Sequence, residues 1–251
     1  MKTAFITGST SGIGKAVALR LAREGFGLIV CGRRAERLTE LKRAIESAAH
    51  AKVCTLSFDV RRYDEVAHAV NSLPDEWKAI DVLVNNAGLA AGFDPVHLGA
   101  TDDWERMIDT NIKGLLYVTR TVSPGMVARR AGHIVNIGSI AGRSVYPNGN
   151  VYCATKHAVD ALSRGMRMDL LPYGIRVTQV CPGAVETEFS LVRFKGDRHR
   201  ADKVYEGYTP LAADDVAEAV CYAVTQPPHV DIQDVLIMPT AQADAGMFHK
   251  K

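Results

Sequence analysis

Two side chains that could transfer a proton, Tyr152 and Lys156, stand four residues apart in the chain. If the segment from about Asn150 is a helix, this spacing places them one turn apart on the same face. A free phenol has a pKa of roughly 10, and a neighbouring cation lowers that value by favouring the phenolate. Such a tyrosine could pass a proton to or from a substrate oxygen. By itself, however, the pattern is common by chance and is more typical of an ordinary surface helix.

A hydroxyl that could assist this pair belongs to Ser139, which follows the apolar run 133–138. Such a run is typical of a buried strand. A hydroxyl at the carboxyl end of that strand could hold the same substrate oxygen as the tyrosine.

The elements that must position these groups alternate along the whole chain. Apolar runs predict strands at about 3–7, 27–31, 53–58, 80–84, 132–138, 175–181 and 235–238, and helical spacing lies between them. A long helical stretch is expected at 102–130. The alternation predicts an α/β fold: a single doubly wound Rossmann-type domain, 1–251, with about seven parallel strands and helices on both faces.

A glycine-rich turn joins the first expected strand to the first helix. Its residues are Gly8, Ser9, Thr10, Ser11, Gly12, Ile13 and Gly14. Glycines let the backbone approach a ligand closely, and a helix N-terminus offers free N–H groups to a phosphate. The strand before the turn and the helix after it favour a phosphate cradle over a tight turn without a ligand.

Arg33 and Arg34 follow the second strand, where NAD-binding folds place an acid for the ribose hydroxyls. Because no acid ends this strand and arginine suits a phosphate, the pair predicts recognition of the 2′-phosphate of NADP. The alternative is a solvated start to the next helix.

Two further strand ends and one long connection complete the expected site. Asn85, Asn86, Ala87 and Gly88 follow the fourth strand, where open α/β sheets bind ligands, although these are also ordinary turn residues. Pro182 and Gly183 follow the sixth strand. Residues 184–208 then form a basic, aromatic stretch without strand character, for which we expect a substrate lid.

Composition excludes several other classes of protein. Hydrophobic residues make up 47% of the chain and charged residues 23%, which is ordinary for a globular domain, and the net charge of +2 indicates neither nucleic acid nor membrane partners. Without a signal-peptide layout or a membrane-spanning run, we expect a cytoplasmic protein. The five cysteines and eight histidines show no metal-binding spacing, so we expect reduced thiols and no metal site.

Together, these motifs resemble the short-chain dehydrogenase/reductase family from end to end. The matching pieces are T-G-x-x-x-G-I-G at 7–14, N-N-A-G at 85–88, Asn111, Ser139, Y-x-x-x-K at 152–156 and P-G at 182–183. The resemblance implies a catalytic tetrad of Asn111, Ser139, Tyr152 and Lys156. Tyr152 would be the acid or base, Lys156 would lower its pKa and hold the nicotinamide ribose, Ser139 would orient the substrate oxygen, and Asn111 would position a water.

The resemblance also implies further contacts to the cofactor. Asp59 and Val60 would meet the adenine, and Thr187 would hydrogen-bond the carboxamide of the nicotinamide. Val185 would contact the cofactor together with Pro182, Gly183 and Thr187. Family members are usually tetramers, so a homotetramer is expected.

Within the family, the chain is similar to the NADP-dependent 3-hydroxy acid dehydrogenases, also described as serine or L-allo-threonine dehydrogenases. The likeness lies in residues 103–114, 149–152 and 187–196, whereas the segment after the last strand lacks the glycine-rich ending of many members. It implies a small hydroxy acid substrate that contacts Ser139 and Tyr152, with Arg143, Arg193 and Lys195 as candidate partners of its carboxylate.

Two alternatives stay open. The same chemistry could act on a neutral ketone, a sugar or a steroid, although the several charges of the expected lid argue against that. The chain could also be a catalytically idle NADP-binding sensor, but its intact Ser139, Tyr152 and Lys156 disfavour this.

Overall fold

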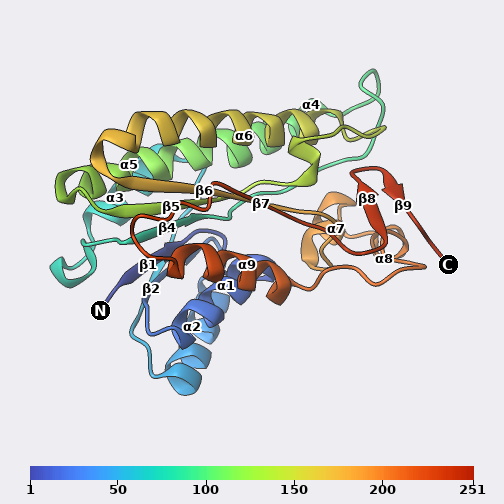
Figure 1. Cartoon of the computed structure of the whole chain (residues 1–251). Coiled ribbons are helices and arrows are strands. Elements are labelled where there is room, and N and C mark those ends of the chain that lie inside the picture. Colours follow the sequence, from blue (N-terminus) through green and yellow to red (C-terminus); the bar gives the residue numbers. More distant parts are fainter.

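The structure is a computed structural model that describes all 251 residues. Seven parallel strands form one sheet in the order β3-β2-β1-β4-β5-β6-β7 (Figure 1). Their bounds are β1 Thr3–Ile6, β2 Gly27–Gly32, β3 Val53–Ser57, β4 Val82–Asn85, β5 Gly132–Ile137, β6 Ile175–Pro182 and β7 Asp234–Ile237. The predicted doubly wound Rossmann-type sheet is therefore confirmed, and each strand lies within two residues of its predicted position.

The direction of winding reverses between β1 and β4, which are paired through Ala4 with Val82 and Ile6 with Val84. From β1 the chain adds β2 and β3 on one side, and it then returns to add β4 to β7 on the other. In such sheets a crevice opens at the carboxyl ends of the strands where the order reverses. Here the glycine-rich turn after β1 and the segment after β4 meet at that point.

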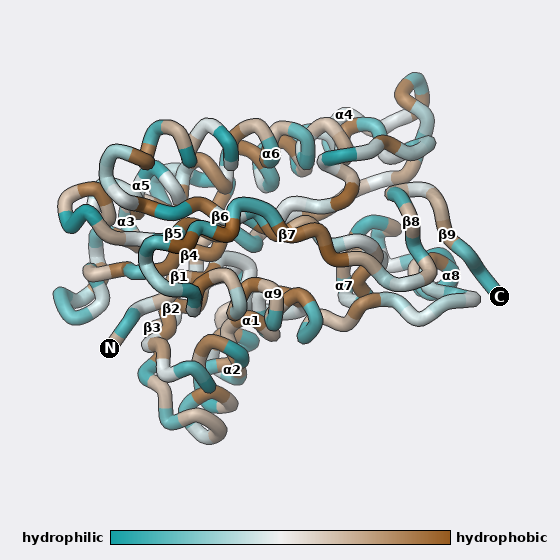
Figure 2. Tube along the Cα trace, viewed as in Figure 1, coloured by the Kyte–Doolittle hydropathy of each residue, from teal (hydrophilic) through white to brown (hydrophobic).

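Helices cover both faces of the sheet because successive strand residues point to opposite sides. Ala4 and Ile6 pack with α1 (Gly12–Arg23), α2 (Ala35–Ala49) and α9 (Ala213–Thr225). Phe5 lies in the opposite core, to which α3 (Tyr63–Asn71), α5 (Leu115–Arg129) and α6 (Asn150–Leu170) contribute. Figure 2 shows the hydrophobic residues concentrated along the strands and the hydrophilic ones on the outer sides of the helices.

The long helical stretch expected at 102–130 is present, but it is not one regular α-helix. It consists of α4 (Thr101–Ile108), a π-helical turn η2 (Asp109–Gly114) and α5. A π-turn widens the backbone ladder locally and is frequent at functional sites. This one contains Asn111, a member of the predicted tetrad.

The expected lid, 184–208, holds two short helices, α7 (Glu188–Arg193) and α8 (Arg198–Lys203), so it is more regular than its sequence indicated. A small hairpin, β8 (Gln242–Asp244) with β9 (Met247–Phe248), lies near it at the same end of the molecule and was not expected from the sequence (Figure 1). Short 3₁₀ turns, η1 (Asp75–Trp77), η3 (Ile140–Gly142) and η4 (Leu171–Tyr173), connect other elements. No helix combines the length and the apolar character that crossing a bilayer requires.

Candidate active site

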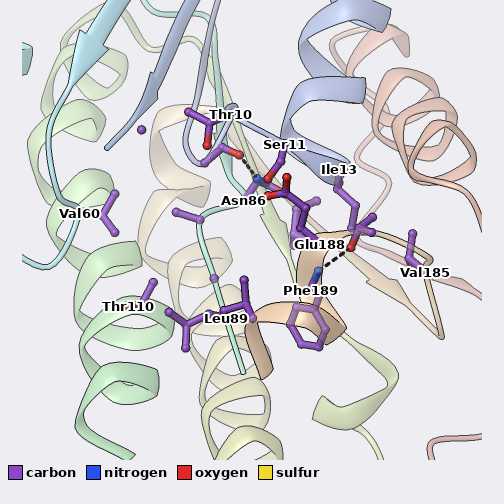
Figure 3. Close-up of a pocket in the computed structure, with 18 of the residues that line it drawn as sticks. Thr10, Ser11, Ile13, Val60, Asn86, Leu89, Thr110, Val185, Glu188 and Phe189 are labelled. Atoms are coloured by element: carbon purple, nitrogen blue, oxygen red, sulfur yellow. Dashed lines mark hydrogen bonds between the residues drawn. The ribbon is translucent and has the colours of Figure 1, made fainter. Parts of the chain in front are cut away.

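A cavity of about 340 Å³ lies at the carboxyl ends of the strands. Its wall contains Ser139, Tyr152 and Lys156 together with most residues of the predicted cofactor site. Figure 3 shows side chains from the glycine-rich turn, the segment after β4 and the lid around this space. The predicted members in the wall are Gly8, Thr10, Ser11, Gly12, Ile13, Arg33, Arg34, Asp59, Val60, Asn86, Ala87, Gly88, Pro182, Gly183, Val185 and Thr187.

Three predicted cofactor residues do not reach the cavity surface. Ser9 is fully buried and its hydroxyl donates to the Ile6 carbonyl. Asn85 donates to Thr119 on α5 and to Asn136 on the neighbouring strand β5. Gly14 packs against Asn86. These three residues lie behind the cavity wall and do not line the cavity.

The glycines of the turn are needed because the backbone is crowded there. Gly8 and Gly12 have φ values of +68° and +52°, which glycine adopts most readily. A Cβ atom on Gly14 would lie 2.4 Å from Asn86 Nδ2. That amide holds the turn by donating to the carbonyls of Thr7 and Gly8 at 2.9 and 3.2 Å. The N-terminus of α1 is thereby fixed at the cavity.

Arg33 and Arg34 differ in how firmly they are held. The Arg33 side chain is 60% exposed, and Nη1 lies 3.9 Å from the Asp59 carboxylate. Partial burial would raise the pKa of Asp59, but hydrogen bonds from Arg61 hold it below its ordinary value. Arg34 Nη2 donates to Thr10 and Ser11 at 2.7 and 2.9 Å. Arg33 is therefore the more available guanidinium for an anion.

Glu188, the first residue of α7, joins the lid to this arginine pair. Its carboxylate accepts from Arg34 Nη1 at 2.9 Å and from Arg37 Nη1 at 2.6 Å. Bonding to Arg37, followed by Arg34, lowers the pKa of Glu188 to about 2, so the carboxylate is ionised at neutral pH. Figure 3 shows Glu188 near Ser11, and both line the cavity.

Tyr152 and Lys156 lie on α6 and are only 8% and 7% exposed, beside Ser139 at 8%. Lys156 Nζ donates to the Ile137 carbonyl at 2.8 Å and lies 6.0 Å from the centroid of the Tyr152 ring. Burial lowers the pKa of Lys156 to about 8. The predicted face-sharing pair is therefore present, together with the expected hydroxyl.

The expected lowering of the pKa of Tyr152 by Lys156 is not found in this structure. Burial raises the pKa of the phenol above its ordinary value, while the Ser139 hydroxyl and the charge of Arg193 act in the opposite direction. The physical reason is desolvation, because a phenolate loses more hydration than a phenol when water is excluded.

Asn111 lies behind the cavity wall and is 2% exposed. Its side-chain oxygen accepts from the Leu89 amide at 2.9 Å, and its nitrogen donates to the Leu89 carbonyl at 2.8 Å and to Thr155 Oγ1 at 3.0 Å. The side chain thus ties the segment after β4 to α6. Its neighbour Thr110, not predicted, lines the cavity instead.

Of the three cations predicted to meet a substrate carboxylate, only Arg193 stands over Tyr152. It does not line the large cavity but a small pocket beside it, whose wall also contains Tyr152. The guanidinium carbon of Arg193 lies 5.4 Å from the centroid of the Tyr152 ring. Nη2 donates to the Tyr146 hydroxyl at 2.6 Å, whereas Nε is buried without a partner. A buried donor without a partner is costly and suits a site that a ligand completes.

Arg143 and Lys195 have other partners in the structure. Arg143 forms ion pairs with Asp234 and Asp160, and it does not line the cavity. Lys195 Nζ lies 2.7 Å from the buried carboxylate of Asp103. The prediction for Arg143 rested on its nearness to Ser139 in sequence, but the turn η3 directs it toward β7 instead. Lys195 anchors the lid to α4.

Sequence reasoning missed several residues of the wall, of which Glu188 and Phe189 are the most informative. Phe189 packs edge-on against Tyr152, with ring centroids 5.5 Å apart. Both follow Thr187 directly, so the only available signal was their place at the start of the expected lid. Leu89, Val192 and Gly138 also line the cavity, as apolar or small residues that no motif marks.

The chain is similar to known proteins over most of its length. The model of the family described as short chain dehydrogenase matches residues 2–196. An NADP-dependent 3-hydroxy acid dehydrogenase of Salmonella typhi is 49% identical over 244 residues, 97% of each chain. Sulfoacetaldehyde reductase 2 of Chromohalobacter salexigens is 47% identical over 240 residues, 95% of this chain and 94% of that one. The closed form of serine dehydrogenase complexed with NADP⁺ superposes with a TM-score of 0.92 at 46% identity, covering 99% of both chains.

Proposed function

The chain belongs to the short-chain dehydrogenase family, and on that premise we propose that it is an NADP-dependent oxidoreductase acting on a small 3-hydroxy acid or its oxo form. The proposed substrates are serine, L-allo-threonine and the 3-hydroxypropionate/malonic semialdehyde pair. The observation that carries the proposal is the Arg193 guanidinium, which stands over Tyr152 with its buried Nε unpaired.

The cavity fits NADP in its residues and in its backbone. The positive φ values of Gly8 and Gly12 and the N-terminus of α1 suit a pyrophosphate. Arg33 is exposed and loosely paired, as a residue awaiting a 2′-phosphate would be. No acid stands at the end of β2 to take the ribose hydroxyls, as it would in an NAD-binding site. NADP, when bound, accepts the hydride in oxidation and supplies it in reduction.

Tyr152 is the proposed acid or base of the reaction. In oxidation the phenolate would take the proton of the substrate hydroxyl, and in reduction the phenol would return one to the carbonyl oxygen. Lys156, fixed by the Ile137 carbonyl, would hold the nicotinamide ribose, and the Ser139 hydroxyl would hold the substrate oxygen. Asn111 would keep the segment after β4 in place beside them.

Arg193 is the proposed partner of the substrate carboxylate. A carboxylate that enters a site lined by Phe189 and Val192 loses hydration and needs a paired cation. The planar guanidinium suits that role, because two N–H groups can meet two carboxylate oxygens. We also propose, from the family, that the protein is a homotetramer.

The proposal is tested by assaying NADP reduction with 3-hydroxypropionate and with its methyl ester. We expect kcat/KM for the acid to exceed that for the ester by at least tenfold, since a charge-assisted bond contributes about 1.5–3 kcal/mol. Arg193→Gln should abolish most of the difference. Equal use of acid and ester, or faster reduction of bulky neutral ketones, would favour a carbonyl reductase instead.

A second candidate keeps the site and changes the anion. A relative at 47% identity is named sulfoacetaldehyde reductase, and the free N–H groups of Arg193 suit a sulfonate as well as a carboxylate. Sulfoacetaldehyde belongs in the same substrate panel. If its reduction had a higher kcat/KM than that of malonic semialdehyde, the sulfonate would be the preferred anion.

A further inference from the structure

Tyr146 is the only side chain to which the Arg193 guanidinium is hydrogen-bonded. Its hydroxyl accepts from Nη2 at 2.6 Å. The Tyr146 ring also lies under the guanidinium, with the Arg193 carbon 5.5 Å from its centroid. Tyr146 comes from the connection between η3 and α6, whereas Arg193 ends α7, so the contact joins the lid to the body of the enzyme.

Phe93 completes the enclosure from the segment after β4. Its ring stacks against Tyr146 at 6.3 Å and 26°, and the Arg193 carbon lies 4.9 Å from its centroid. A backbone hydrogen bond also joins the two segments, because Gly92 N donates to the Arg193 carbonyl at 3.1 Å. Aromatic faces attract a guanidinium without consuming its N–H groups. The charge is therefore oriented while Nε stays free.

The position of the Tyr146 ring is itself constrained. A Cβ atom on Gly149 would lie 2.3 Å from Tyr146 Cε2, so a glycine is needed there for the ring to lie flat against the start of α6. Tyr146 is also half-buried. A ring that is fixed in this way holds the Arg193 guanidinium at one distance from the Tyr152 ring.

We propose that Tyr146 is a positioning residue for substrate specificity: with Phe93, it orients Arg193 so that its free N–H groups face the substrate anion above Tyr152. The inference rests on the proposed function, in which Arg193 binds that anion. It goes further in assigning the choice between charged and neutral substrates to a phenol that touches neither substrate nor cofactor.

The test is Tyr146→Phe, which removes one oxygen atom and keeps the ring. The acid and ester of 3-hydroxypropionate are assayed with NADP in the wild type and the variant. We expect KM for the acid to rise roughly tenfold with kcat little changed, because a hydrogen bond to a charged group is lost. The kinetics with the ester should stay at the wild-type values.

The outcomes separate the two proposals. If the wild type does not distinguish acid from ester, the proposed function is wrong. If the wild type does distinguish them and Tyr146→Phe does so equally well, only the role of Tyr146 is overturned. Equal losses of kcat/KM with both substrates would show that Tyr146 has only a structural role. That outcome would also overturn the positioning role proposed for it.

Two further variants provide a second test of the enclosure and a control. Phe93→Leu removes one face of the enclosure and keeps an apolar side chain, so it should also raise KM for the acid more than for the ester. Tyr117→Phe loses a phenol oxygen on α5, outside the cavity, and should match the wild type with both substrates. NADPH titration of each variant checks that the cofactor site is intact.

Discussion

At the scale of single residues, the site depends on charges placed where water is scarce. Tyr152 is buried against Phe189, and its surroundings favour the neutral phenol in the structure described here. Lys156 is buried as well, and its lowered pKa of about 8 means that part of its ammonium is lost in mildly alkaline solution. Burial is thus the main cause that sets the ionisation of both groups in this structure.

Replacing Tyr152 with Phe should nearly abolish turnover while NADPH still binds. The variant keeps the ring that packs on Phe189 but lacks the proton donor, so kcat should fall by roughly 10²–10⁴-fold or more. Steady-state kinetics gives the loss, and fluorescence titration with NADPH gives the affinity. A Phe variant that kept most of its kcat would show that another group moves the proton.

Arg33 should determine the preference for NADP over NAD, with Arg34 assisting. Because Arg33 is exposed and Arg34 is held by Thr10 and Ser11, Arg33→Ala should lower kcat/KM for NADP about ten- to a hundredfold and leave that for NAD nearly unchanged. Arg43→Ala, which removes an exposed arginine of α2 outside the cavity wall, is the matched control. A wild type that used both cofactors equally would refute the assignment.

At the scale of elements, β5 contains a histidine whose ring must stay neutral. His133 is 2% exposed, and its Nε2 lies 2.7 Å from Thr178 Oγ1. Because that hydroxyl donates to the Ile232 carbonyl, it accepts from Nε2–H, and Nδ1 is left without a partner. Burial, and then the charge of Arg176, lower the pKa of His133 to about 3.

This histidine should make the fold less stable in mild acid. Its pKa is about 3 in the folded state and roughly 6.5 when unfolded, so the unfolded chain binds the extra proton as the pH falls from 6.5 toward 3. Stability from this group is complete above pH 6.5, and it decreases by up to about 1.4 kcal/mol per pH unit below that.

Urea unfolding of the wild type and His133→Gln at pH 7 and pH 5 measures this contribution. The variant should show a smaller loss of unfolding free energy between the two pH values. His97→Gln changes an exposed histidine in the segment after β4 and should behave like the wild type. Parallel losses in all three proteins would mean that other groups cause the acid sensitivity.

At the scale of the whole molecule, alternation of apolar runs was sufficient to predict the fold. Ala4, Phe5 and Ile6 are all buried because β1 is central, so its run is continuous and easy to recognise. The π-turn at Asn111 and the hairpin of β8 and β9 were not foreseen, since neither has a strong local periodicity.

The candidate site was predictable where a motif fixes a backbone, and less so where side chains choose between partners. Gly8 and Gly12 were predicted because their conformation demands glycine. Ser9 and Asn85 belong to the same motifs but bond inside the protein, and a motif does not distinguish the two sides of a turn. Arg143 lies near Ser139 in sequence yet pairs with Asp234 and Asp160, acids that are 91 and 17 positions further along the chain.

The bridge from Glu188 to Arg34 and Arg37 makes the two halves of the cavity thermodynamically interdependent. Any anion that draws Arg34 away from Glu188 changes the energy of α7, and Arg193 ends that same helix. By linkage, the factor by which NADP changes the affinity for an acid equals the factor by which the acid changes the affinity for NADP. A cofactor lacking the 2′-phosphate would therefore alter the dissociation constant of the acid as well as its own, and calorimetric titrations in both orders would reveal identical factors.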